Sequence, residues 1–300
     1  MRKRQSAKRK KSKKQEQAQK PTVDIQDIEY ETEAVEEHAN VLFKPNPGPQ
    51  TDFLAASERE VLYGGSAGGG KSYAMLADPL RYMGHPQFSG LLLRHTTEEL
   101  RELIFKSQEL YPKIWPGIKW SERKMQWTAP SGARLWMSYL DRDEDVLRYQ
   151  GLAFSWIGFD ELTQWGNPYA WNYMRSRLRS TAPDLPIFMR ATTNPGGRGH
   201  HWVKKMFIDP APYNKAYDAT DIETHEILRY PAGHSKAGKP LFKRRFIPAR
   251  LSDNPYLSET GDYEAMLLSL PEQQRRQLLD GDWDIKEGAA FTEFDRDIHV

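Results

Sequence analysis

Strands and helices alternate along the central part of the chain, as the spacing of apolar residues predicts. Short apolar runs of strand length lie at 60–63, 91–93, 154–159 and 186–193. Residues 71–83, 98–110 and 170–179 instead carry apolar residues at helical spacing. Two further runs, 125–128 and 133–139, flank Pro130-Ser131-Gly132, which predicts a hairpin. Because strands that alternate with helices pair in parallel, we predict an α/β fold with a mostly parallel central sheet covered on both faces.

The periodic pattern weakens after about residue 200. Residues 225–230 and 245–250 are strand candidates, and 263–279 is a helix candidate that Gly281-Asp282-Trp283 ends. We therefore expect a leader at 1–40, a main α/β domain at 41–235, a small linker or lid subdomain at 236–285 and a connecting segment at 286–300.

Composition and charge narrow the function classes. The chain has no cysteine, which excludes disulfides and thiol nucleophiles, and no apolar run of the roughly 18 residues that span a bilayer. Of the 43 basic and 41 acidic residues, the first twenty hold ten and one, which leaves 33 and 40, or a net charge of −7 for the remainder. This basic segment fits a nucleic-acid backbone, and it fits a solubilising tail or a localisation signal equally well.

The strongest motif is a phosphate-binding loop between the first predicted strand and the first predicted helix. It reads Gly65-Ser66-Ala67-Gly68-Gly69-Gly70-Lys71-Ser72 and matches G-x-x-x-x-G-K-[ST] in the required strand–loop–helix context. Loop N–H groups and the helix N-terminus would hold the phosphates of ATP, and Lys71 would reach the β- and γ-phosphate oxygens. The Ser72 hydroxyl is expected to bind Mg²⁺.

A second acidic site follows a buried strand about ninety residues downstream. The segment 155–159 is apolar and ends in Asp160-Glu161. Asp160 is expected to hold the Mg²⁺ coordination sphere, and Glu161 to polarise the attacking water. This order indicates an ATPase whose catalytic glutamate lies on the strand next to the P-loop strand, and it argues against the small GTPases.

These residues resemble the ATPase motor of the large terminase subunits of tailed phages. The resemblance covers about residues 43–283 and adds three pieces to the two motifs above: Gln50, then Thr192-Thr193-Asn194-Pro195-Gly196, and a late signature. That signature is Phe246-Ile247-Pro248-Ala249-Arg250-Leu251, then Asp253-Asn254-Pro255, then Gly281-Asp282-Trp283. The fold implied is the ASCE or RecA-like P-loop fold, with residues 41–235 as its ATPase domain.

The resemblance also implies roles for single residues. Gln50 would contact adenine, and Thr193 and Asn194 would sense the γ-phosphate and couple hydrolysis to DNA movement. Independently, a strand that ends in Thr-Thr-Asn places polar groups at the edge of the sheet where ligands bind. An arginine finger is expected from Arg148, with Arg94 second and Arg198 third.

The function implied is an ATP- and Mg²⁺-dependent motor that translocates double-stranded DNA into a procapsid. It would act as a homo-oligomeric ring with the portal protein and the small terminase subunit in the host cytoplasm, without a membrane. Residues 290–295 resemble only the entrance to a nuclease domain, so we expect no DNA cleavage by this chain alone. Two alternatives stay open: a helicase or remodelling ATPase, and a nucleotide-gated assembly module without turnover. His200-His201 lack a third ligand at metal-binding spacing, and we expect them in a solvent-facing or DNA-side loop.

Overall fold

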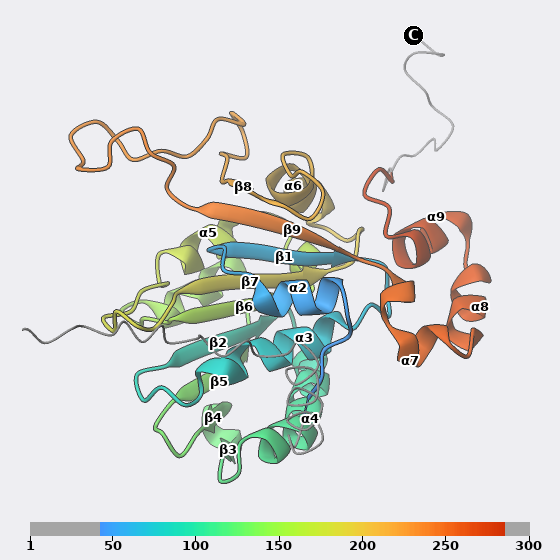
Figure 1. Ribbon diagram of the computed structural model, residues 1–300, viewed down its shortest axis with the longest axis horizontal. Helices are drawn as coiled ribbons and strands as arrows, with labels where there is room; N and C mark the ends of the chain where they lie inside the picture. The colour runs from blue at the N-terminus through green and yellow to red at the C-terminus, as the bar shows by residue number, and fades with distance from the viewer. Residues whose placement is uncertain (1–42, 286–300) are drawn as a thin grey trace, which may run out of the picture. The chain divides into compact units, whose positions relative to one another are not determined.

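The computed structural model describes residues 43–285, so the expected leader (1–40) and connecting segment (286–300) lie outside the described residues. A nine-stranded sheet forms the centre, in the order β3-β4-β5-β2-β6-β7-β1-β9-β8 (Figure 1). The strands are β1 (Glu60–Gly65), β2 (Ser89–Arg94), β3 (Lys119–Ser121), β4 (Gln126–Thr128), β5 (Arg134–Tyr139), β6 (Trp156–Asp160), β7 (Phe188–Thr193), β8 (Ala216–Asp218) and β9 (Lys243–Ala249). The helices are α2 (Pro49–Ala55), α3 (Lys71–Ala77), α4 (Thr97–Ile114), α5 (Tyr169–Arg175), α6 (His200–Val203), α7 (Pro255–Ser258), α8 (Asp262–Leu268) and α9 (Glu272–Arg275).

The six strands from β5 to β9 in this order pair in parallel, and the pairs β3–β4, β4–β5 and β8–β9 are antiparallel. The parallel core and the hairpin of β4 and β5 confirm the pattern expected from the sequence. The chain is thus a mixed α/β protein with a mostly parallel sheet, as predicted.

Side chains alternate between two buried cores along each central strand. On β1, Val61 and Tyr63 pack into a core with residues of α2, α3 and α4, whereas Leu62 packs into a core with residues of α5 and α6. On β2, Leu92 joins the first core, and Leu91 and Leu93 join the second. Successive strand residues point to opposite faces, so this division shows that helices cover both faces of the sheet.

Several helices begin or end at different residues than the apolar pattern predicts. Helix α4 begins at Thr97 because Thr96 and Glu99 form a reciprocal capping box. Helix α3 ends at Ala77, and a 3₁₀ turn with Pro79 near its start continues to Tyr82. The helix expected over 263–279 is broken before Pro271, and 225–230 forms only isolated bridges in place of a strand.

Strand β9 lies in the central sheet, directly beside β1. It pairs in parallel with β1 from Arg244 to Ala249, within the stretch 236–285 that was expected to form a small linker or lid subdomain. After β9, the helices α7, α8 and α9 gather at the end of the sheet where β9 stops (Figure 1). Pairing between strands so far apart in sequence leaves no local signal, because the contact depends on the whole sheet.

The prediction that the strand with Asp160 lies next to the P-loop strand was wrong. Strand β6, which carries Asp160, does not lie next to β1; β7 lies between them and pairs with both. Thr192 on β7 therefore stands between the P-loop strand and the acidic strand, opposite Tyr63 on one side and Asp160 on the other.

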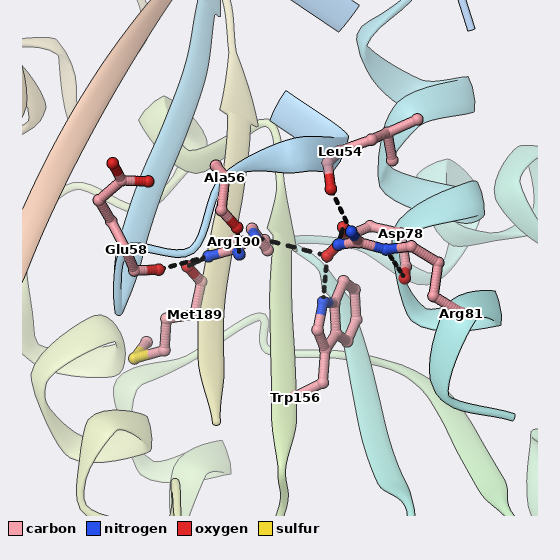
Figure 2. A network of polar contacts seen from close by, with 8 residues as sticks. All are labelled: Leu54, Ala56, Glu58, Asp78, Arg81, Trp156, Met189 and Arg190. Atoms are coloured by element: carbon pink, nitrogen blue, oxygen red, sulfur yellow. Dashed lines mark hydrogen bonds and ion pairs between the residues drawn. The ribbon is translucent and has the colours of Figure 1, made fainter. Parts of the chain in front are cut away.

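The far end of the P-loop helix is fixed to the sheet by a buried charged network (Figure 2). Asp78, directly after α3, accepts a hydrogen bond of 2.7 Å from the Trp156 indole of β6 and pairs with Arg190 of β7 at 3.4 Å. Arg190 donates to the carbonyl oxygens of Ala56 and Glu58, and Arg81 also bonds to Asp78. Because two partners of the Asp78 carboxylate come from β6 and β7, the network fixes the end of α3 against the sheet.

Candidate nucleotide site

The P-loop follows β1 at the carboxyl end of the sheet and bends sharply at its first residue. Gly65 has φ +141°, and a Cβ there would lie 2.3 Å from the Ala249 carbonyl oxygen. The next residue, Ser66, donates its backbone N–H to that same oxygen at 2.9 Å. Only glycine allows this close approach of the loop to β9, because any side chain at position 65 would collide with the backbone of that strand.

The middle of the loop presents backbone donors. Among the described residues, the N–H groups of Gly68 through Tyr73 donate to no other group of the chain, whereas those of Ser66 and Ala67 are paired. These free donors surround the beginning of α3, where the partial positive charge of the helix adds to them. The arrangement is that of an anion site, as the sequence predicted.

The residues after β9 hold the P-loop from outside. Asn254 donates its side-chain amide to the Gly68 carbonyl oxygen at 2.6 Å, and Ala67 donates its N–H to the Leu278 carbonyl oxygen at 2.7 Å. Leu251 and Tyr263 also approach Gly68. Leu251 and Asn254 belong to the late sequence signature, but their contact with the P-loop was not predicted, because contacts between segments this far apart in the sequence leave no local pattern.

Gln50, the expected adenine contact, is buried beneath the P-loop. Its amide nitrogen donates to the Gly70 carbonyl oxygen at 2.9 Å, and its amide oxygen accepts the Asn46 N–H at 2.6 Å. Both polar ends of the side chain are thus used inside the chain, and Gln50 does not line the nucleotide cavity. In this structure it supports Gly70; its contact with adenine stays a prediction.

Asp160 ends β6 and is fully buried. Its Oδ1 accepts a hydrogen bond from the Thr192 hydroxyl. Its Oδ2 lies 2.9 Å from Nε of Arg94, yet the two are not aligned as a hydrogen bond, so Oδ2 keeps an unused acceptor position. Arg94 ends β2, the strand beside β6, and is itself buried. The carboxylate is therefore oriented by Thr192 and neutralised by Arg94.

Glu161 follows with a strained backbone. Its φ of +61° lies in the left-handed region that residues with a Cβ rarely adopt. Such strain persists where the surrounding structure demands it, often at functional sites. Removal from water and the neighbouring Asp160 carboxylate raise the pKa of Glu161, while Lys71, Arg94 and the Asn194 N–H oppose the shift.

Lys71 lies at the start of α3 and is buried. Its ammonium donates to the Ser66 carbonyl oxygen across the loop. Burial lowers the pKa of Lys71 to about 8, and the carboxylates of Glu161 and Asp160 oppose this shift. Burial thus disfavours the charged form of Lys71, and a ligand with several negative charges would stabilise it.

One cavity of about 240 Å³ joins these groups. It is lined by Ala67, Gly68, Gly69, Gly70, Lys71, Ser72, Tyr73, Lys106, Glu161, Asn194, Asn254 and Leu257. The structure thus brings the P-loop, Lys71, Ser72 and Glu161 together. Lys106 and Tyr73 also line the cavity, although no sequence motif marks them.

The end of β7 connects Glu161 to the following loop. The hydroxyl groups of Thr193 and Thr163 lie 2.7 Å apart, and Thr163 N–H donates to the Thr193 hydroxyl. Thr193 thus faces the turn that begins at Glu161, not the cavity. Asn194 lines the cavity, and its buried Oδ1 has no hydrogen-bond partner among the described residues.

His200 is buried in the loop after Asn194, contrary to the expected solvent-facing position, whereas His201 is exposed. His200 Nδ1 accepts the Gly196 N–H at 2.9 Å, and the ring stacks on Trp283 with centroids 5.4 Å apart. It therefore packs the glycine loop against the end of the described chain.

The two other candidate finger arginines lie away from the cavity. Arg148 has 45% of its side chain exposed, donates to the Tyr139 carbonyl oxygen at 2.8 Å, and pairs with Asp145 at 3.4 Å. Arg198 is exposed in the glycine loop. Neither lines the cavity of its own chain. Arg94 lies inside the site, but it is engaged with Asp160.

Mg²⁺ fits this donor set only together with a phosphate ligand. Residues 43–285 contain no group of three acidic or histidine side chains that could hold a metal by themselves. They do offer the Ser72 hydroxyl and the unused acceptor position of Asp160, which suits a cation that keeps water and phosphate oxygens in its shell. Within the same part of the chain, no helix is long and apolar enough to cross a bilayer.

Residues 62–298 match the family described as terminase large subunit, T4likevirus-type, N-terminal. No curated protein is significantly similar to the chain in sequence. Among solved structures, the large terminase of a thermophilic bacteriophage in complex with ADP is similar with a TM-score of 0.57 and 15% identity, over 80% of this chain and 54% of that one. The same terminase with ATP-γ-S gives 0.55 and 14%, over 80% and 53%.

The ATPase domain of the large terminase from Thermus phage P74-26, as an arginine-to-alanine mutant, is similar with a TM-score of 0.51 and 12% identity, over 80% of this chain and 94% of that domain. The chain therefore spans about half the length of the thermophilic phage terminase and most of the length of the isolated ATPase domain. At these identities the likeness shows a common fold, which is that of the large terminase ATPase domain.

Proposed function

We propose that this chain, which belongs to the T4likevirus-type family of terminase large subunits, is an ATP-hydrolysing motor that moves double-stranded DNA into a procapsid. The observation that carries the proposal is the cavity in which the P-loop donors, Lys71 and Glu161 meet. The terminase of the thermophilic bacteriophage has been solved with ADP and with ATP-γ-S, which supports the same class of nucleotide for this chain.

In this proposal each group in the cavity, and Asp160 beside it, has one task. The free N–H groups of Gly68 through Tyr73 and the ammonium of Lys71 bind the phosphates. Ser72 and Asp160 would hold Mg²⁺, and the metal would supply positive charge to the β- and γ-phosphates. Glu161, raised in pKa and held in a left-handed backbone conformation, accepts a proton from the attacking water.

Coupling begins at Asn194 and Thr193. Asn194 lies in the cavity with an unused side-chain oxygen, and Thr193 is bonded to Thr163 in the turn after Glu161. A change at the γ-phosphate would therefore reach the glycine loop through two adjacent residues. The packing of His200 on Trp283 continues this path toward the residues after β9.

A ring of subunits explains how Arg148 would act. The side chain is exposed and lies outside the cavity of its own chain, which fits a finger supplied to a neighbouring subunit. Arg94 would instead act in its own chain, beside Asp160. The portal protein, the small terminase subunit and a transient location on the procapsid in the host cytoplasm belong to the same proposal.

The test is steady-state ATP hydrolysis by the purified chain over a concentration series, with and without linear duplex DNA. A rate per subunit that rises with concentration, and rises again with duplex DNA, is the expected result. A rate that is flat in both favours a self-contained ATPase of the remodelling type. Nucleotide binding without turnover under all conditions favours an assembly module.

A matched pair of variants distinguishes a specific role of Arg148 as the arginine finger from a general effect of removing an exposed arginine. Arg148→Ala is expected to remove the concentration-dependent part of the rate and to keep nucleotide binding. Arg123→Ala, which removes another exposed arginine, is expected to leave both unchanged. Equal loss in the two variants would contradict the role of Arg148.

A further inference from the structure

A second lysine faces the nucleotide cavity besides Lys71. Lys106 lies in the middle of α4 and lines the same cavity as the P-loop, Glu161 and Asn194. It belongs to no motif, because in the sequence it reads as one charged residue on the polar side of a helix. Its place in the cavity follows from the packing of α4 beside α3.

The side chain of Lys106 is held by two neighbours. Its ammonium lies 2.5 Å from a carboxylate oxygen of Glu102, one turn earlier on α4, and 5.7 Å from the ring centroid of Tyr73 on α3. Tyr73 follows Ser72 directly and also lines the cavity. About 29% of the Lys106 side chain stays exposed. Lys106 thus lines the cavity beside Tyr73, and its ammonium is held by a neighbour on the same helix.

We propose that Lys106 binds the phosphate chain of the nucleotide and is a second cation supplied by the same chain as the P-loop. The proposal rests on the proposed ATPase function. A nucleoside triphosphate carries several negative charges, and the P-loop offers them one ammonium, that of Lys71, whose protonated form is disfavoured by burial. Lys106 keeps partial contact with water, which solvates its charge while the nucleotide is absent.

The pair with Glu102 does not prevent this role. An exposed ion pair four residues apart on a helix is weak and is easily exchanged. A polyphosphate with more charge than one carboxylate competes well for the same ammonium.

The experiment measures binding of ADP and ATP-γ-S to the full chain by titration calorimetry, with the melting temperature as a check on folding. Lys106→Gln is expected to weaken binding on the order of tenfold, since bonds to charged groups are among the stronger ones. Lys106→Arg is expected to recover most of the affinity. Lys113→Gln, which removes an exposed lysine of the same helix, is the matched control and is expected to bind as the unaltered chain does.

Glu102→Gln separates a phosphate contact from a helix-stabilising pair. If Lys106 binds phosphate, removing its competitor keeps or tightens nucleotide affinity. Unchanged binding by Lys106→Gln would overturn the proposal, as would an equal loss in Glu102→Gln and Lys106→Gln. Either result leaves the proposed ATPase function standing, since that function is tested separately by turnover.

Discussion

Arg94 and Asp160 end two neighbouring strands, and their side chains meet at the carboxyl end of the sheet, with Nε of Arg94 2.9 Å from Oδ2 of Asp160. Both side chains are buried. The guanidinium thus neutralises the carboxylate that the proposed Mg²⁺ would contact, before any metal is bound. Arg94 and the metal are therefore alternative partners for one oxygen of Asp160, and the balance between them is accessible to experiment.

Arg94→Ala is expected to lower the free energy of unfolding by about 3–5 kcal/mol, because it leaves a buried carboxylate without its cation. Urea unfolding without ligand measures this loss. Mg²⁺ with ADP is expected to stabilise the variant more than the unaltered chain, since the metal then meets no competing guanidinium. Arg148→Ala removes an exposed arginine and is expected to change stability by less than about 0.5 kcal/mol. Equal losses in the two variants would contradict this.

Lys71→Met is expected to stabilise the chain without nucleotide by about 3 kcal/mol at pH 7, because it removes a buried ammonium whose pKa is lowered from 10.5 to about 8. The folded-state pKa of Lys71 is about 8, below its ordinary value of 10.5. Its protonated form therefore costs stability fully below pH 8, and the cost disappears as the pH rises from 8 to 10.5.

Thermal unfolding of both chains from about pH 7 to about pH 10 measures this effect. The advantage of Lys71→Met is expected to shrink as the pH rises, while nucleotide binding by the variant is lost at every pH. A difference in melting temperature that stays constant above pH 8 would show that the lysine charge is not its cause.

The network of Figure 2 predicts strong coupling between Asp78 and Arg190. Asp78→Leu leaves the buried Arg190 without its carboxylate, and Arg190→Met leaves Asp78 with Arg81 as its remaining cation. Each variant is expected to cost about 3–5 kcal/mol. The double variant leaves neither charge, so its cost is expected to fall short of the sum by at least about 1 kcal/mol. Denaturant unfolding of the four chains completes the cycle, and strictly additive losses would contradict a shared network.

The elements that the sequence predicted well are those with a local signal. The strands around 60–65, 91–93 and 156–160 are continuous apolar runs, and the P-loop carries its glycines at fixed spacing. The capping box of Thr96 and Glu99 is also a local signal, but it was not among the predictions, and the start of α4 was therefore expected one residue too late.

The parts that the sequence did not predict depend on distant contacts. Strand β9 joins the sheet beside β1, and β7 separates β1 from β6, through pairings between segments far apart in the sequence. Gln50 binds Gly70, and Asn254 binds Gly68, through hydrogen bonds that no spacing rule records. His200 reads as polar in the sequence, yet stacking on Trp283 buries it.

Glu161→Gln is expected to lower the turnover of ATP by about 10²–10⁴-fold and to keep ATP binding, because the amide fills the same space but accepts no proton from water. Single-turnover hydrolysis and nucleotide titration measure the two quantities. Glu109→Gln, which changes an exposed carboxylate of α4 in the same way, is expected to keep turnover. Retained turnover in Glu161→Gln would remove the assigned role.

The pH dependence of turnover gives an independent test of the same residue. Burial of Glu161 raises its pKa, and the neighbouring Asp160 carboxylate raises it further. A general base works only when ionised, so the rate is expected to fall as the pH falls through this raised pKa, at a higher pH than an ordinary carboxylate would give. Arg94→Ala removes a cation that opposes the shift, and is therefore expected to move the acid limb to still higher pH. If the acid limb does not move in Arg94→Ala, Arg94 does not influence the pKa of Glu161, even if Glu161 itself is the base.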